Sequence, residues 1–415
     1  MLSQFSFSNY KSFKNTAFLD MMAESIKDNM ESVIVNTTDE ERFLPVASIY
    51  GPNGGGKSTV LEALIFLKSF LLQQIILSDM QDESDRFRAR FISKISVSLK
   101  NKYHRFAEEC KEIPTEFDLM FRTEESEFRY QLSMIETLIV EENLYVRALN
   151  SEEVDIIFER SEEECVLGEE VEGIAVERIK NTMPLLTHIA MNYEIPRVND
   201  AIIWFKNVKV VDYNSPLLDR QIIMPEEEKS KKQIFQILQS MDINIVDFRI
   251  EKDLDGNIED IYAKHVLPNG NVVEILFEEE SSGTKKLFSC LAEIIECLDK
   301  GHLMIADELD AKLHPKLLKS IVGLFTNPNT NKKGAQLLLT SHDITTMIPE
   351  VFRRDEIWFC AKNPENASKL YSLIAFRKEN GLPPRNDEIY GKQYMEGRYG
   401  ADPYVQRILE WGTVD

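Results

Sequence analysis

Short apolar runs separated by polar, glycine-containing segments predict a chain that mixes strands and helices. Residues 45–50 (PVASIY) form an apolar run typical of a buried strand, and residues 59–67 place apolar side chains at helical spacing. Residues 303–306 (LMIA) and 337–340 (LLLT) form two more apolar runs, and each leads into polar residues. Buried strands combined with helices are typical of an α/β fold with a largely parallel sheet.

Two other regions have the period-2 alternation of antiparallel strands. Residues 117–147 alternate apolar and polar positions, and residues 249–277 contain Asp-Gly and Asn-Gly turns between alternating runs. Residues from about 150 to 240 are less regular, and we expect mainly helical and irregular structure there. They contain no sustained heptad pattern, so any coiled-coil arm is short.

A glycine-rich segment follows the first of the predicted strands. Residues 51–58 (GPNGGGKS) fit the pattern G-x-x-x-x-G-K-[ST], in which backbone N–H groups surround phosphates at a helix N-terminus. In such a loop Lys57 contacts the β- and γ-phosphates, and the Ser58 hydroxyl binds Mg²⁺. A turn that only joins two elements is the alternative, but the flanking strand and helix favour a nucleoside triphosphate site. The expected nucleotide-binding residues here are Asn53, Gly54, Gly55, Gly56, Lys57, Ser58 and Thr59.

Two acidic residues follow the predicted strand at 303–306. Asp307 and Glu308 are thereby placed at the carboxyl edge of the sheet, where open parallel sheets bind their ligands. Many strands end in solvated acids, but these two follow a phosphate-binding loop by about 250 residues. We therefore expect Asp307 to bind Mg²⁺, directly or through water, and Glu308 to orient and polarise the attacking water.

Two further stretches complete the candidate site. His342 follows the strand at 337–340; a histidine in such a place is usually a surface or core residue. Ser282 and Gly283 precede an amphipathic helical run and predict an anion-binding helix start, with a plain N-cap as the alternative. Because the loop at 51–58 already binds phosphates, a second such site is explained best by contact with the nucleotide of another subunit.

Charge and composition limit the possible partners and location. The 415 residues carry a net charge of −22, which argues against a protein that coats nucleic acid. Residues 151–179 hold eleven acids and two arginines; we favour a solvated helical face over a docking surface for a basic partner. There is no secretory signal pattern, and no uninterrupted apolar stretch approaches the roughly 20 residues of a membrane span. Five scattered cysteines indicate a reduced, cytoplasmic protein without a metal besides Mg²⁺.

In the order described, the phosphate-binding loop, SSGT (281–284), ADELDAKLHP (306–315) and TSHD (340–343) resemble the ABC-type ATPases of the SMC/RecF branch. FSFSNYKSFKN (5–15) is similar to the opening strand and turn of that branch, which run into the adenine side of the site. DELDAKLHP and the tail YGKQYMEGRYGADPY (390–404) resemble the stand-alone bacterial ATPases of the abortive-infection group, relatives of the overcoming-lysogenization (OLD) ATPases that include RloA-like anti-phage proteins.

The resemblance implies an ABC-ATPase head, with a P-loop core sheet, an antiparallel β-subdomain and a short, mainly helical insertion. The implied domains are an N-terminal lobe at 1–149, an acidic insertion at 150–240 and a C-terminal lobe at 241–415. It implies Walker B roles for Asp307 and Glu308, and a switch histidine at His342 that contacts the γ-phosphate. Gln131 is a candidate for the Q-loop glutamine.

In this branch two heads sandwich two ATP molecules, so a homodimer or a higher homo-oligomer is implied. Ser282 and Gly283 would contact the opposing γ-phosphate, and Asp310 would lie in the D-loop between the sites. The signature Ser-Ser-Gly-Thr-Lys departs from the transporter-type Ser-Gly-Gly-Gln, which leaves the strength of this contact open.

Three function classes remain open at this point. The leading hypothesis is a defence ATPase that controls a separate effector protein from the same operon, because we find no nuclease or hydrolase residue set in the chain. The alternatives are a RecF/SMC-like DNA-repair ATPase that binds duplex DNA and, less well supported, the nucleotide-binding subunit of a transporter. From the net charge we expect weak or no intrinsic DNA binding.

Overall fold

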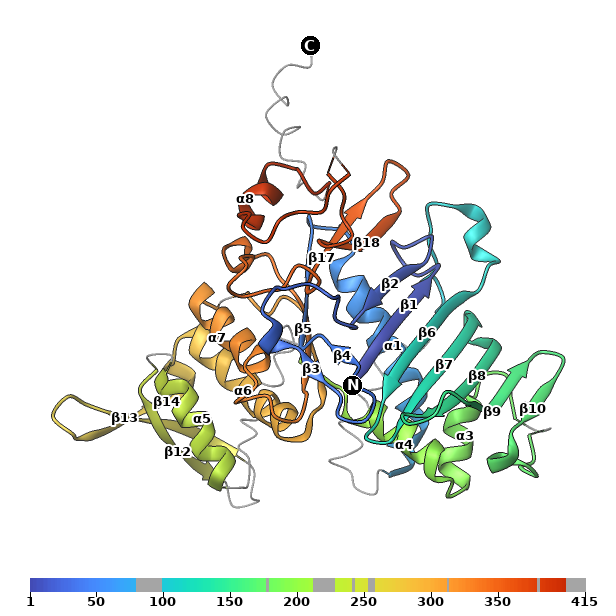
Figure 1. The fold of residues 1–415 in the computed structure, drawn as a ribbon. Coiled ribbons are helices and arrows are strands. Elements are labelled where there is room, and N and C mark those ends of the chain that lie inside the picture. The colour runs from blue at the N-terminus through green and yellow to red at the C-terminus, as the bar shows by residue number, and fades with distance from the viewer. Residues whose placement is uncertain are drawn as a thin grey trace, which may run out of the picture.

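A computed structural model gives the arrangement of most of the chain. It describes residues 1–79, 99–176, 179–211, 228–240, 243–252, 258–311, 313–378 and 381–400. The elements form two large sheets, two smaller sheets and the helices that pack on them (Figure 1). A mixed α/β fold is therefore confirmed, with a parallel core sheet and a separate antiparallel sheet.

The core sheet has the order β11-β15-β16-β5-β17-β18. All its neighbours pair in parallel except β17 and β18, which are antiparallel. The central strand β5 is fully buried because neighbours cover both its edges and both its faces, which explains its uninterrupted apolar run. The strands span Val46–Tyr50 (β5), Lys209–Val211 (β11), Leu303–Ala306 (β15), Gln336–Thr340 (β16), Ile357–Lys362 (β17) and Ser368–Ser372 (β18).

The second sheet is antiparallel and has the order β10-β9-β8-β7-β6-β1-β2. One of its faces is apolar and packs on helices, as expected for a half-buried antiparallel sheet. The strands span Leu2–Ser8 (β1), Ala17–Asp20 (β2), Thr115–Arg122 (β6), Ser126–Ile135 (β7), Leu138–Ala148 (β8), Val154–Ser161 (β9) and Cys165–Leu167 (β10). The helices α3 (Leu185–Asn192) and α4 (Pro196–Asn207) contact each other and α1. The predicted antiparallel strands at 117–147 are confirmed.

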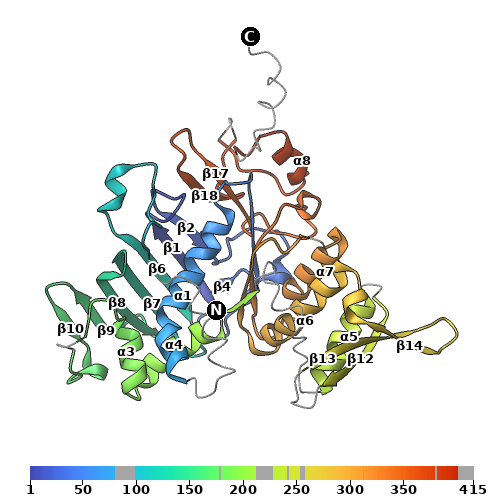
Figure 2. The same ribbon diagram turned by 180° about the vertical axis from the view of Figure 1, so that it is seen from behind.

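Helix α1 (Lys57–Asp79) joins the two large sheets (Figure 2). Its apolar side chains share one hydrophobic core with strands of both sheets, so apolar residues lie on all its sides. Residues Lys57–Ser78 are long and apolar enough to cross a membrane by length and composition, although charged and polar residues interrupt the apolar run. More than half of the relevant window is buried inside the protein, and core helices of soluble proteins pass the same test.

A three-stranded antiparallel sheet lies beside α5 and α6, with the β13–β14 hairpin extending outward (Figure 1). It consists of β12 (Ile245–Lys252), β13 (Ile258–Val266) and β14 (Val272–Leu276), and α5 (Glu228–Ser240) packs against it. The predicted hairpins at 249–277 are thus confirmed, although the Asp-Gly turn itself lies outside the described residues. Helix α6 (Ser282–Lys300) follows, capped by Ser281 and ended by Gly301 at φ 74°.

The acidic segment 151–179 differs from our prediction of a helical face. Residues 154–161 and 165–167 form β9 and β10, and a 3₁₀ turn covers Glu169–Val171. The apolar residues Ile157 and Phe158 are buried, whereas most acids of the segment are exposed or half-buried. The negative charge is therefore compatible with strands at the margin of a sheet, where charged residues hinder pairing with other chains. The limits at 149/150 and 240/241 stay predictions.

Two further helices lie in the C-terminal half, and two short strands near the N-terminus pair with each other. These are α7 (Pro315–Thr326), α8 (Tyr390–Met395), β3 (Ile34–Val35) and β4 (Arg42–Phe43). Pro315 is the first residue of α7, where its missing N–H costs no hydrogen bond. Of the C-terminal tail at 390–404, the part after residue 400 lies outside the described residues.

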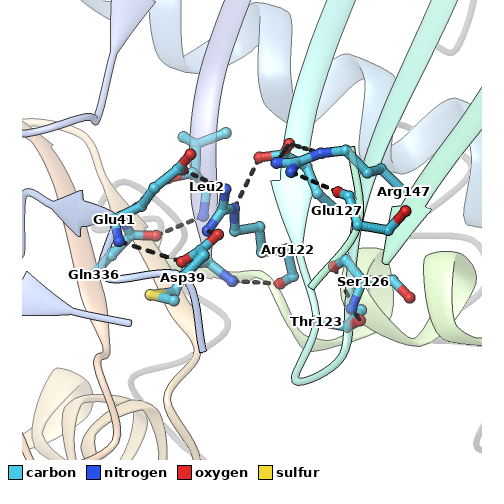
Figure 3. A network of polar contacts seen from close by, with 11 residues as sticks. Leu2, Asp39, Glu41, Arg122, Thr123, Ser126, Glu127, Arg147 and Gln336 are labelled. Atoms are coloured by element: carbon cyan, nitrogen blue, oxygen red, sulfur yellow. Dashed lines mark hydrogen bonds and ion pairs between the residues drawn. The ribbon is translucent and has the colours of Figure 1, made fainter. Parts of the chain in front are cut away.

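A buried polar network joins the N-terminal strands to the core sheet (Figure 3). The fully buried Arg122 guanidinium donates to Glu127 Oε1 at 2.8 Å and Asp39 Oδ2 at 2.8 Å, and it also pairs with Glu41. Gln336, at the start of β16, accepts a hydrogen bond from Leu2 N at 2.6 Å and donates to Leu2 O at 3.0 Å. Because β16 ends beside the candidate site, these contacts fix one wall of that site relative to β1.

Candidate nucleotide site

The loop after β5 requires glycine at positions where other chain segments approach closely. A Cβ on Gly51 would lie 2.3 Å from the Cys360 carbonyl oxygen on the neighbouring strand β17. Gly56 has φ 109°, and a Cβ there would lie 2.7 Å from Ser368 Oγ. Side chains at these two positions would force the loop away from β17 and β18. The loop conformation is therefore set by its contacts with the core sheet.

Lys57 is the first residue of α1, and its side chain folds back over the loop. The Nζ atom donates hydrogen bonds to the carbonyl oxygens of Gly51 at 2.9 Å and Pro52 at 3.3 Å. Burial lowers the pKa of Lys57 from its ordinary value. A buried ammonium group beside the N-terminus of a long helix is a favourable environment for phosphate oxygens.

Three oxygen-bearing side chains meet below this loop. Ser58 Oγ donates to Asp307 Oδ1 at 3.0 Å, and Thr340 Oγ1 donates to the same atom at 2.5 Å. Hydroxyl and carboxylate oxygens are the ligands that Mg²⁺ prefers, and Mg²⁺ is usually held by one or two protein groups together with phosphates. The predicted metal ligands Ser58 and Asp307 are thus brought together across 249 residues of sequence.

Glu308 lies at a turn with unusual backbone geometry. Its φ of 47° is in the left-handed region, which non-glycine residues rarely adopt and which is common at functional sites. Its backbone N–H donates to Thr340 Oγ1 at 2.7 Å, so one hydroxyl contacts both members of the acidic pair. Glu308 Oε1 lies 3.8 Å from His342 Nε2, and both side chains are partly exposed. The backbone N–H of His342 donates to Asp310 Oδ2 at 3.0 Å.

These elements border one cleft of about 450 Å³. Its lining residues are Lys11, Ser12, Pro52, Asn53, Gly54, Gly55, Gly56, Lys57, Ser58, Thr59, Glu308 and His342. The residues predicted from the glycine-rich loop, the acidic pair and the histidine therefore form one site. The loop contributes backbone N–H groups and the Lys57 ammonium group to the cleft, and Glu308 and His342 contribute a carboxylate and an imidazole.

Ser282 and Gly283 lie at the first turn of α6 and are not among the residues that line this cleft. The prediction placed these two residues before the helix, whereas the structure places them within its first turn. Ser281, rather than Ser282, caps the helix, because Ser281 Oγ accepts a hydrogen bond from Thr284 N at 3.1 Å. Ser282 is exposed and its hydroxyl is not needed for the cap. Contact of this helix start with a second subunit stays a prediction.

Gln131 is not at the cleft, so our candidate for the Q-loop glutamine was wrong. It lies on β7, where its side-chain amide donates to Asp118 Oδ2 at 2.9 Å. It borders a different hollow, on the polar face of the antiparallel sheet. Side chains alternate between the two faces of the sheet along β7, and this alternation places Gln131 on the polar face.

Thr340 and Lys286 are two residues of the site that reasoning from the sequence missed. Thr340 belongs to the strand-end segment TSHD, so its place beside Asp307 could have been anticipated from strand order alone. Lys286 reaches the site from α6, and its Nζ donates to the Glu308 carbonyl oxygen at 3.1 Å. No spacing rule in the sequence indicates that contact.

The described residues contain no group of three or more His, Cys, Asp or Glu side chains placed to hold a metal ion. All five cysteines are free thiols. Burial raises the pKa of Cys360, next to the glycine-rich loop, to about 12. That thiol is consequently uncharged and a weak nucleophile at neutral pH.

Comparison with known proteins gives a family and a set of distant structural likenesses. The SMC head domain from Thermotoga maritima is 13% identical, with a TM-score of 0.43 over 89% of this chain and 98% of that chain. An Smc head bound to the C-winged helix domain of ScpA is 16% identical, with a TM-score of 0.43 over 90% and 98%. An Smc head with an extended coiled coil, bound to the C-terminal domain of ScpA derived from Pyrococcus furiosus, is 13% identical over 90% and 96%, with a TM-score of 0.38. With TM-scores below 0.5, these three structures carry no argument about residue roles in this chain.

No curated protein sequence matches the chain significantly. A family model does match, over residues 46–164 and 190–347, which together make up more than half of the chain. The match includes the glycine-rich loop, α6, the acidic pair and His342. The chain therefore belongs to the family described as "AAA domain, putative AbiEii toxin, Type IV TA system".

Proposed function

We propose that this protein binds ATP with Mg²⁺ and hydrolyses it to ADP and phosphate. The observation that carries the proposal is the shared cleft, in which the loop at 52–59 faces Glu308 and His342. The contact between Ser58 and Asp307 supports it, because these oxygens fit Mg²⁺ and lie at the base of the loop. Bound Mg²⁺ would supply positive charge that offsets the charge of the phosphates.

The residues of the site then have separate tasks. Lys57 and the loop N–H groups bind the β- and γ-phosphates, and Ser58 and Asp307 hold the metal ion. Glu308 orients a water molecule and accepts its proton, and His342 contacts the γ-phosphate from the same side. The left-handed backbone of Glu308 and the hydrogen bond from its N–H to Thr340 hold this carboxylate in position.

Glu308→Gln tests this function. The variant keeps the shape of the side chain but loses the basic oxygen, so we expect ATP binding within about threefold of wild type and turnover reduced at least about 100-fold, within the range of general-base effects. Bound nucleotide is measured by equilibrium dialysis and turnover by phosphate release. Hydrolysis at the wild-type rate would show that Glu308 is not the base, and a wild-type protein without turnover would refute the ATPase function itself.

We further propose that two subunits sandwich two ATP molecules, with Ser282 and Gly283 of one subunit facing the nucleotide of the other. The exposed position of Ser282, away from the cleft of its own subunit, supports this arrangement. Asp310 would then lie near the boundary between the two sites, where it already orients the backbone of His342.

At the cellular level, we propose a cytoplasmic sensor or scaffold that controls a separate effector protein, in the manner of RloA-like anti-phage ATPases. The family description names a putative AbiEii toxin of a type IV toxin–antitoxin system, which supports a link to such a system and names no separate effector. Purification from the native operon, with and without ATP, tests the proposal by the identity of the proteins that co-elute. The absence of any operon-encoded protein under both conditions would count against an effector.

The competing function is a DNA-repair ATPase. A net charge of −22 opposes binding to a polyanion, so we expect a dissociation constant above 1 µM for duplex DNA near physiological salt, on the order of non-specific binding. Fluorescence anisotropy measures binding of a duplex of about 40 base pairs in a salt series, with ATP and the Glu308→Gln variant present. The result decides between control of an effector protein and DNA repair. Sub-micromolar binding with a steep salt dependence would favour the repair function.

A further inference from the structure

Lys286 connects helix α6 to the turn that carries Glu308. It lies one turn after Gly283, and its side chain is 8% exposed. Its Nζ donates hydrogen bonds to the carbonyl oxygens of Glu308, at 3.1 Å, and Ala311. A buried ammonium group is stable only where it has such partners, and both oxygens belong to the backbone of the same turn.

The turn itself explains why this contact matters. The N–H of Ala311 donates to the Glu308 carbonyl at 2.9 Å, so the turn from 308 to 311 is closed by one backbone hydrogen bond. Glu308 has φ 47° within it, a conformation that persists only where the surroundings hold it. Lys286 contacts the carbonyls at the two ends of this turn, while the Thr340 hydroxyl accepts the hydrogen bond from the N–H of Glu308.

We propose that Lys286 is a positioning residue for the Glu308 carboxylate. By fixing the carbonyl of Glu308, it sets the direction in which the side chain leaves the backbone, toward the cleft and His342. Because Lys286 belongs to the helix that begins with Ser282 and Gly283, a displacement of that helix start also displaces Glu308 within the same subunit. This proposal rests on the ATPase function proposed above.

Lys286→Met tests the role of the ammonium group, because methionine keeps most of the length of the side chain and cannot donate hydrogen bonds. We expect turnover at saturating ATP to fall at least about tenfold, the size of effect seen when a catalytic group is misplaced. ATP affinity should change less than about twofold, because the phosphate-binding loop is not altered. Lys286→Arg should restore part of the turnover, since a guanidinium can donate to two carbonyl oxygens.

Lys300→Met is the matched control. Lys300 lies on the same helix, is exposed and pairs with Glu296 at 3.0 Å, so the same substitution there should leave turnover unchanged. The double variant Lys286→Met/Glu308→Gln should turn over no more slowly than Glu308→Gln alone, because Lys286 acts through Glu308. Full additivity of the two effects, or a Lys286→Met protein with wild-type turnover, would overturn the proposal and leave the ATPase function intact.

A second measurement does not depend on catalysis. The N–H groups of Leu309 and Ala311 are hydrogen-bonded to Thr340 O and Glu308 O, so their hydrogen exchange reports on the turn. We expect at least about tenfold faster exchange of residues 308–311 in Lys286→Met, and no change in Lys300→Met. Unchanged exchange in Lys286→Met would overturn the proposal, whether or not the wild type hydrolyses ATP. A wild-type protein without turnover would by itself refute only the ATPase function.

Discussion

Glu356 makes the stability of this protein dependent on pH in a way that Glu356→Gln should remove. The residue precedes β17 and is fully buried. One carboxylate oxygen accepts a hydrogen bond from Arg353 N at 2.8 Å, and among the described residues the other has no hydrogen-bond partner. Burial raises the pKa of Glu356 from 4.5 to about 8, so the side chain is protonated in the folded protein at neutral pH.

The direction of the effect follows from the two pKa values. Between pH 4.5 and about 8 the unfolded chain releases this proton while the folded protein keeps it, so the free energy of unfolding falls as the pH rises. Each pH unit in this interval costs about 1.36 kcal/mol. Between pH 6 and pH 8.5 the loss amounts to at most about 2.5 kcal/mol, because it levels off above pH 8. Glutamine has the same shape and does not titrate, so the variant does not suffer this loss.

Thermal unfolding of wild type and Glu356→Gln at pH 6 and pH 8.5 measures the difference. The lower pH stays above the pI of about 4.9, where the protein would lose solubility. We expect the melting temperature of the variant, relative to wild type, to rise by about 2 to 5 °C more at pH 8.5 than at pH 6. Glu350→Gln, at an exposed position a few residues earlier, serves as the control without such a trend. A variant whose advantage is the same at both pH values would refute the reasoning.

Three further predictions concern the site. Ser58→Ala removes a metal-binding hydroxyl and should raise the Mg²⁺ concentration needed for half-maximal turnover by about tenfold, measured in a Mg²⁺ titration; an unchanged titration would show that Ser58 is not a ligand. Thr340→Val leaves the Glu308 N–H without its acceptor and should lower the free energy of unfolding by about 1 to 3 kcal/mol, measured by denaturant titration. An unchanged free energy would contradict the role of this hydroxyl in holding Asp307 and Glu308. Ser282→Arg should leave ATP affinity unchanged but abolish ATP-dependent dimerisation in light scattering; loss of affinity with normal dimerisation would place this helix start at its own subunit's site.

The parts of the fold and site that could be predicted from the sequence are those whose signals are local. The strand β5, the loop after it and α1 follow each other within about 35 residues, and the pattern of glycines and apolar residues specifies all three. Asp307 and Glu308 could be placed because the carboxyl ends of parallel strands share one edge of a sheet. In the structure β16 lies between β15 and β5, and Ser58 contacts Asp307 at the carboxyl edge of these strands.

The parts that could not be predicted depend on contacts distant in sequence. The strand β9 was not predicted because its acidic residues are also typical of a solvated helix. At the margin of a sheet such residues can stay exposed to solvent within a strand. Helix α1 is apolar over most of its length because strands of both large sheets and the helices α3 and α4 share its core. The sequence of one helix does not distinguish this environment from that of a membrane span. Lys286 contacts backbone oxygens, and backbone acceptors exist at every position, so no residue type in the sequence marks its partner.

The distance of 249 residues between Ser58 and Asp307 also has a consequence for biosynthesis. At about 5 to 20 residues per second, roughly 12 to 50 s pass on the ribosome between the synthesis of these two residues. During this time β5 and the very apolar α1 have been made, but β15, β16 and β17, which later cover them, have not. Besides β5, the described strands and α-helices that are made before β15 and share a core with α1 are β1, β2, β6 to β10, α3 and α4. Nascent chains should therefore depend on chaperones until the C-terminal strands emerge, and ATP can assist folding only after that point.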